Sequence, residues 1–259
     1  MEQHGWLTDT HPIFSMVDLL QHVASHLQDA KDVASFVCCF HPHDAPRRNA
    51  VFQCITRLNA CSPRTPQASM SLRIARSLGR FNNLTRLDIS NPPGGSKFVA
   101  DMHHLSVLSL KNIPSLHDRW VTGLQQLPSL TSLDISGAQD IWTDEVVAIA
   151  THLSQLQELD LSSHWRLGRT AARALGRMTN LTSLNISYTG VRGAKLSHLS
   201  ALTRLTRLVA TNNQIDDFAV AHVSHMTSLK SLDLRRNPIS QDGAAVLMIQ
   251  LTRLESLNT

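Results

Sequence analysis

The sequence predicts an α/β solenoid with an N-terminal helical segment. In this architecture the repeats stack openly, with a parallel β-sheet on the concave face and short helices on the convex face. Three observations predict it. A frame with the spacing Leu-x-x-Leu-x-Leu recurs in steps of 21 to 26 residues, and apolar residues at helical spacing follow it. Of the 259 residues, 42% are hydrophobic but only 5% are aromatic, so Leu and Ala must supply the core.

The frame defines the strands. Its eight starts are Leu84, Leu105, Leu130, Leu156, Leu181, Leu205, Leu229 and Leu254, and a degenerate ninth copy occupies residues 55–60. Because alternate residues of a strand point to opposite faces, we expect the fourth and sixth positions to enter the core. The third, fifth and seventh positions then face outward. We therefore expect nine parallel strands, stacked into one apolar column.

The segments between frames predict the helices. Apolar residues recur at helical spacing in residues 143–153, 169–178, 194–202, 217–226 and 242–251. These segments are rich in Ala and poor in Gly, which favours helix. Thr143 and Asp217 are candidate N-caps. A strand and a short helix in each repeat give a curved stack.

The repeats resemble the leucine-rich repeat family over residues 55–259. The resemblance implies a leucine-rich repeat solenoid that binds another macromolecule, and we therefore expect a binding protein and not an enzyme. The family places Asn at the ninth position of each repeat, which here only Asn213 and Asn237 occupy. Other residues at this position predict less regular turns in the earlier repeats: Pro92, Ile113, Ala138, His164 and Thr189.

We expect residues 1–54 to form a separate helical segment before the solenoid, which we assign to residues 55–259. Ser15 and Asp18 have the spacing of a capping box, and two apolar helical faces follow. The segment resembles an F-box, which implies binding to a Skp-family adaptor of a ubiquitin ligase. The resemblance assigns this contact to Leu19, Leu20, Val23, Leu27, Phe36 and Val37. The alternative is a helical cap that only covers the first repeat.

Gly243-Ala244-Ala245, after a strand and its turn, is similar to the GALA-type repeats of plant-pathogen effectors. That similarity implies a substrate-recognition subunit of a ubiquitin ligase that acts as a bacterial effector in host cells. The alternative is a structural or regulatory repeat protein without a ligase. A leader pattern is absent, and the four cysteines, all before the first complete frame at Leu84, have no dense pattern typical of a disulfide framework. We therefore expect a cytoplasmic protein, in the host cytoplasm if it is injected.

Charges occur in blocks of one sign. Residues 120–165 contain six acids and neither Lys nor Arg, whereas residues 161–215 contain eight basic residues and no acid. Such blocks predict a polarised surface. We predict that a protein partner binds the concave face through Lys111, Asp134, Glu158, Asp160, Tyr188, Arg207, Arg235 and Arg236. The alternative surface is a convex arginine stripe formed by Arg169, Arg173 and Arg177.

We assign no catalytic residue, no metal ligand and no cofactor. Cys38 and Cys39 are adjacent and lack zinc-site spacing. Aspartates at the fifth position, such as Asp88 and Asp160, would stand on an open, wet surface unsuited to acid–base catalysis. Neither a nucleophile elbow nor a phosphate loop occurs. Nucleic-acid binding is not favoured, because no aromatic platform accompanies the arginines.

Overall fold

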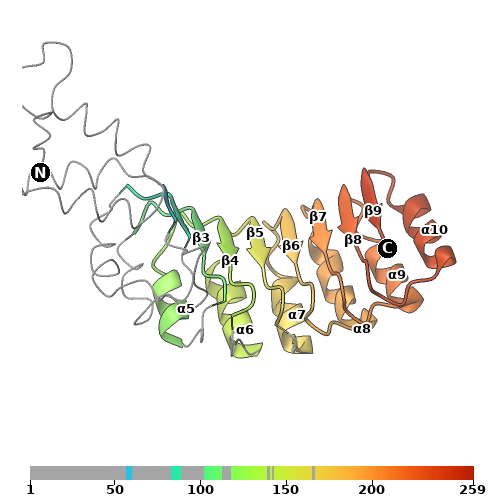
Figure 1. Ribbon diagram of the computed structural model, residues 1–259, viewed down its shortest axis with the longest axis horizontal. Helices are drawn as coiled ribbons and strands as arrows, with labels where there is room; N and C mark the ends of the chain where they lie inside the picture. Colours follow the sequence, from blue (N-terminus) through green and yellow to red (C-terminus); the bar gives the residue numbers. More distant parts are fainter. Residues whose placement is uncertain are drawn as a thin grey trace, which may run out of the picture.

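A single parallel sheet organises the molecule. The computed structural model describes residues 57–59, 83–88, 102–112, 118–138, 141, 143–164 and 167–259. Nine three-residue strands pair in chain order, and Figure 1 shows β3 to β9 as a row along one side of the molecule. The strands are β1 (Arg57–Asn59), β2 (Arg86–Asp88), β3 (Val107–Ser109), β4 (Ser132–Asp134), β5 (Glu158–Asp160), β6 (Ser183–Asn185), β7 (Arg207–Val209), β8 (Ser231–Asp233) and β9 (Ser256–Asn258). The predicted solenoid with nine parallel strands is confirmed.

The register places the fourth-position leucines in one row, from Leu58 on β1 to Leu257 on β9. The sixth-position side chains from Leu110 to Leu234 are at most 1% exposed. Both predicted inward positions are thus core positions along the middle of the stack. Burial of apolar surface between neighbouring repeats is therefore the main stabilising contribution.

Short helices cover the other side of the sheet (Figure 1). They are α5 (Asp118–Leu124), α6 (Thr143–His152), α7 (Arg169–Leu175), α8 (Gly193–Leu196), α9 (Asp217–Val223) and α10 (Gln241–Gln250). The helix predicted for residues 194–202 is only partly α-helical, because α8 gives way to the 3₁₀ helix η2 (Ser197–Ala201). There the hydroxyls of Ser197 and Ser200 donate to carbonyls three residues earlier, which competes with regular α-helical bonding.

Neither of the two predicted N-caps occupies the N-cap position, and Thr143 is instead the first residue of α6. Asp216, and not Asp217, is the N-cap of α9, and its carboxylate accepts from the backbone N–H of Ala219. The neighbouring Asp217 accepts from the backbone N–H of Ser240, in the next repeat. Ser240 in turn caps α10. This chain of bonds ties the start of α9 to the start of α10.

The turns after β3 to β8 use a left-handed backbone at the eighth position. Asn112, Gly137, Ser163, Tyr188, Asn212 and Arg236 all have φ between 51° and 68°. The ninth position is then buried and polar in three of the described repeats, at His164, Thr189 and Asn213. His164 donates from Nε2 to the carbonyl of Ile135, as Asn213 does from Nδ2 to that of Ile186. Different polar side chains thus hold equivalent turns, so the expected irregularity does not extend to these repeats.

The N-terminal segment 1–54 lies outside the described residues, and so do its predicted adaptor contacts, Leu19, Leu20, Val23, Leu27, Phe36 and Val37. Among the described helices, none has the length and apolar character needed to span a bilayer.

Candidate protein-binding surface

The concave face is the outward side of the sheet, formed by the third and fifth positions of the repeats. The third-position row runs from Ser132 through Glu158 and Ser183 to Arg207, and the fifth-position row runs beside it. Parallel pairing places neighbours in a row about 4.8 Å apart. Charges that are 24 to 26 residues apart in the sequence therefore become neighbours on one rigid surface.

An acidic hollow occupies the middle of this face. It has a volume of about 230 Å³, and its lining includes Asp134, Glu158, Asp160 and, at one side, Arg207. The Ser132 hydroxyl donates to Glu158 Oε2 at 2.9 Å. Three of the predicted partner-binding residues thus form one acidic group. Arg207, which the sequence places in a basic block, borders that group.

The fifth-position carboxylates also hold the turns that follow their strands. Asp134 Oδ1 accepts from the backbone N–H of Ser136 at 3.0 Å, and Asp160 Oδ1 accepts from that of Ser162 at 2.8 Å. The second oxygen of Asp160 accepts from Asn185 Nδ2 at 2.9 Å. These bonds fix the orientation of the carboxylates, so their charge is held in place before any partner arrives.

Lys111 borders the acidic hollow on the side of the early repeats. Its Nζ lies 3.2 Å from Asp134 Oδ2, and this carboxylate raises the pKa of Lys111. The residue follows β3 and is half-exposed, with 51% of its side chain accessible. Lys111 therefore neutralises one end of the acidic group, and the surface charge of the hollow is concentrated at Glu158 and Asp160.

A second hollow, of about 200 Å³, lies after the strands and is lined by Tyr188, Thr211, Arg235 and Arg236. Arg236 Nη1 donates to the Tyr188 hydroxyl at 3.1 Å, across the repeat between them. Tyr188 and Arg236 both occupy the left-handed turn position, with φ of 58° and 61°. Both of these predicted contact residues therefore lie in turns and not in strands of the sheet. The turns hold them, and a left-handed conformation costs a non-glycine residue about 1 kcal/mol.

Arg235 is engaged within its own turn. Its guanidinium donates two hydrogen bonds to the Asp233 carboxylate, from Nη2 to Oδ2 at 2.7 Å and from Nε to Oδ1 at 3.0 Å. These hydrogen bonds lower the pKa of Asp233, and the charge of Arg207 lowers it further. Of the predicted arginines, Arg207 and Arg236 are therefore better placed than Arg235 to meet an acidic partner.

The sequence analysis selected charged and aromatic residues and missed the polar ones that orient them. Ser132, Asn185 and Thr211 line the two hollows. Their positions in the repeat frame, third, fifth and seventh, could have identified them. Within the described residues no group of three or more His, Cys, Asp or Glu side chains could hold a metal ion.

Comparison with known proteins agrees with this architecture. The leucine-rich repeat family model matches residues 225–248, and no protein with a curated description matches the chain. An internalin (inlF) from Listeria monocytogenes has a similar structure, with a TM-score of 0.54 and 19% identity over 82% of this chain. The match covers 63% of that internalin, less than two thirds of its length. Internalin C2 from the same species has a TM-score of 0.51 and 24% identity, and the match covers 70% of this chain and 83% of that one. At these identities the similarity shows the fold alone.

Proposed function

We propose that this leucine-rich repeat protein is a scaffold that binds a protein partner across the concave face from β4 to β8. The observation that carries the proposal is the pair of hollows with different charge, one acidic and one bearing Tyr188 and Arg236. A partner segment with basic side chains toward the first and acidic side chains toward the second fits both. Such complementarity selects partners and fixes their register.

The rigidity of this face supports binding. Sheet register and the bonds to Glu158, Asp160 and Arg236 hold the charged groups before contact. Little side-chain entropy then opposes association. Tyr188, which is 43% exposed, offers the kind of large amphipathic side chain that often dominates an interface.

Charge reversal tests the proposal. Peptides selected from a randomised display library on the wild-type chain should bind at least tenfold more weakly, about 1.4 kcal/mol, to the double variant Arg207→Glu/Arg236→Glu. Arg235 is left unchanged, because its reversal would also unpair Asp233.

The matched control is Arg173→Glu/Arg177→Glu, two exposed arginines of the convex stripe. It should retain binding. If the selected peptides lose affinity only for this control, the convex arginine stripe is the binding surface and the concave assignment is wrong.

The N-terminal segment supports a more specific role as the substrate-recognition subunit of a ubiquitin ligase. In that role the F-box-like residues, among them Leu19, Leu20 and Phe36, contact a Skp-family adaptor, and the concave face selects the substrate. The GALA-like repeat Gly243-Ala244-Ala245 supports action as an injected effector, in the cytoplasm of a host cell. The alternative role is that of a regulatory repeat protein whose N-terminal helices serve as a cap.

Co-elution of the purified chain with a Skp-family adaptor separates these roles. The ligase role predicts a stable complex that Leu19→Ala/Leu20→Ala abolishes, while the circular dichroism of the repeats is unchanged. Arg207→Glu/Arg236→Glu should leave adaptor binding intact. If the wild-type chain elutes without the adaptor, the segment is a cap, and the concave-face proposal still stands.

A further inference from the structure

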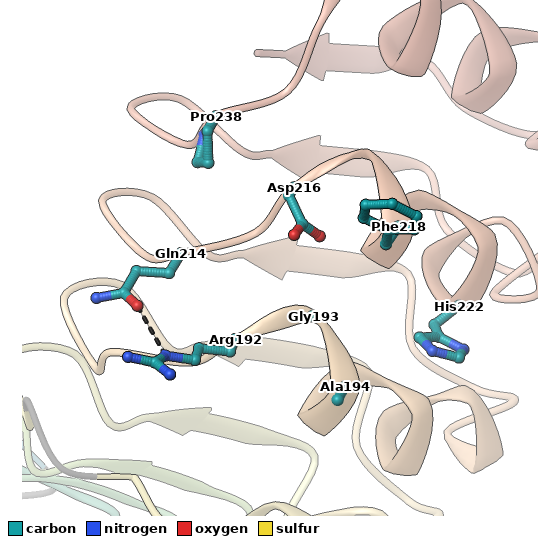
Figure 2. Close-up of a pocket in the computed structure, with 8 residues that line it drawn as sticks. All are labelled: Arg192, Gly193, Ala194, Gln214, Asp216, Phe218, His222 and Pro238. Carbon is teal, nitrogen blue, oxygen red and sulfur yellow. Dashed lines mark hydrogen bonds between the residues drawn. The ribbon is translucent and has the colours of Figure 1, made fainter.

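A hollow of about 490 Å³ lies outside the concave face, at the edge where the chain passes from the sheet to the helices. Its lining comes from three successive repeats, and Figure 2 shows Arg192, Gln214, Asp216 and Pro238 along it, with Phe218 on the first turn of α9. None of its residues lines the two concave hollows. We call it the Phe218 groove.

Two small residues at the start of α8, Gly193 and Ala194, line the groove. A Cβ on Gly193 would lie 2.7 Å from Ala219 Cβ and 3.1 Å from Asp216 Oδ1, so glycine lets α8 begin close against α9. The next residue, Ala194, is exposed and presents only a methyl group. The floor of the groove is therefore open, and a larger side chain from a partner can enter it.

Phe218 forms an apolar wall of the groove and is not part of the buried core. Its side chain is 88% exposed, whereas Ala219, Val220 and Val223 of the same helix are buried in the core. His222 lies one turn further along α9 and lines the same groove. A phenyl ring held on a helix beside a hollow gains from burial only when another molecule covers it.

A basic side chain borders the opposite side of the groove. Arg192 Nε donates to Gln214 Oε1 at 2.8 Å (Figure 2), which orients the guanidinium along the rim. Lys195 donates to the carbonyl of Leu167. Its pKa is lowered by partial burial first, and then by the charges of Arg192 and Arg169. Arg192 is the arginine that lines the groove, whereas Lys195 and Arg169 are not among its lining residues.

The two nearby acids accept backbone hydrogen bonds at the starts of α9 and α10. Asp216 Oδ1 accepts from the N–H of Ala219, and Asp217 Oδ1 accepts from the N–H of Ser240. A ligand carboxylate at the outer edge of Arg192 would therefore meet a guanidinium whose Nε is already oriented by Gln214.

We propose that the Phe218 groove is a second docking site, for an extended segment of a protein partner that carries a large apolar side chain next to acidic residues. The apolar side chain packs against Phe218 above Ala194, and a neighbouring carboxylate pairs with Arg192. Charge complementarity with Arg192 selects an acidic segment over a basic one. The site is independent of the concave face, so one chain can hold two protein segments at once.

The test uses the full chain with its concave face disabled by Arg207→Glu/Arg236→Glu. Peptides from a randomised display library are selected on this variant, and their affinities are measured by fluorescence polarisation. We expect enrichment of peptides with a large apolar residue adjacent to Asp or Glu. Their affinity should fall at least tenfold when Phe218→Ala, Ala194→Trp or Arg192→Glu is added to the selection variant.

Met248→Ala, added in the same way, is the matched control, because it removes another exposed apolar side chain, 68% accessible, from a different helix. It should leave the affinity unchanged. Phe218 and Ala194 are exposed, so circular dichroism should show intact folding in their variants. Failure to enrich any peptide, enrichment of basic peptides, or equal binding to all groove variants would each overturn the proposal.

Discussion

Substitution of Asn213 tests whether side-chain hydrogen bonds to the backbone stabilise the turns. This buried side chain sits between two repeats, and its Oδ1 accepts from the backbone N–H groups of Thr189 at 3.0 Å and Val191 at 3.1 Å. Its Nδ2 donates to the carbonyls of Ile186 and Ala210. One amide thus satisfies backbone groups in its own turn and in the preceding turn.

The cost of Asn213→Ala follows from which groups lose their partner. The Ile186 carbonyl also accepts from the Thr189 hydroxyl, and the Ala210 carbonyl also accepts from Asn237, so both remain bonded. The N–H groups of Thr189 and Val191 lose the bonds to Asn213 Oδ1. Each buried donor left unsatisfied costs about 1–3 kcal/mol. Because the intervening Gly190 is only half-buried, water relieves part of the cost, and we expect a loss of about 3 kcal/mol.

Urea unfolding followed by circular dichroism measures this loss. Hydrogen exchange should localise it to the amides of Thr189 and Val191, since repeats are coupled mainly to their neighbours. The control, Asn212→Gly, alters an exposed residue with φ of 51°, a conformation that glycine adopts freely. If Asn213→Ala stays within about 0.5 kcal/mol of wild type and exchange at both amides is unchanged, these bonds do not stabilise the turn.

Two further predictions concern stability. Burial lowers the pKa of His164. Above the ordinary histidine pKa of about 6.5, the side chain is neutral in both the folded and the unfolded chain, and its contribution to stability is complete. This contribution is lost as pH falls below that value, because the unfolded chain then binds a proton more readily than the folded one. The unfolding free energy should therefore fall between pH 7.5 and 5.5 by more in wild type than in His164→Asn, and equal pH dependence would contradict the argument. A Cβ on Gly176 would collide with the carbonyl oxygen of His198, whereas one on Gly168 would meet only the Thr143 hydroxyl at 2.8 Å. Gly176→Ala should thus lower the unfolding free energy by about 2 kcal/mol and Gly168→Ala by less, and a reversed order in urea unfolding would be inconsistent with this packing.

The candidate surface was predictable in part. The repeat frame correctly brings Glu158, Asp160 and Arg207 together, because parallel strands place equivalent positions side by side. It could not show that Arg235 folds back onto Asp233, or that Tyr188 reaches Arg236 across a whole repeat. Those contacts depend on side-chain conformation and turn geometry, which spacing does not encode. The exposure of Phe218 was predictable in part, since burial of Ala219, Val220 and Val223 leaves Phe218 on the outer side of α9.

The sequence by itself determined the fold, the number of strands and their inward positions. A period of 24 to 26 residues over most of the chain allows leucines to be buried only when equivalent strands stack in parallel. Tertiary structure decided how the turns are satisfied and where hollows open. The ninth-position substitutes His164 and Thr189 could be recognised only once the carbonyls of Ile135 and Ile186 were in place. The Phe218 groove is lined by residues of three successive repeats, so no single repeat contains it.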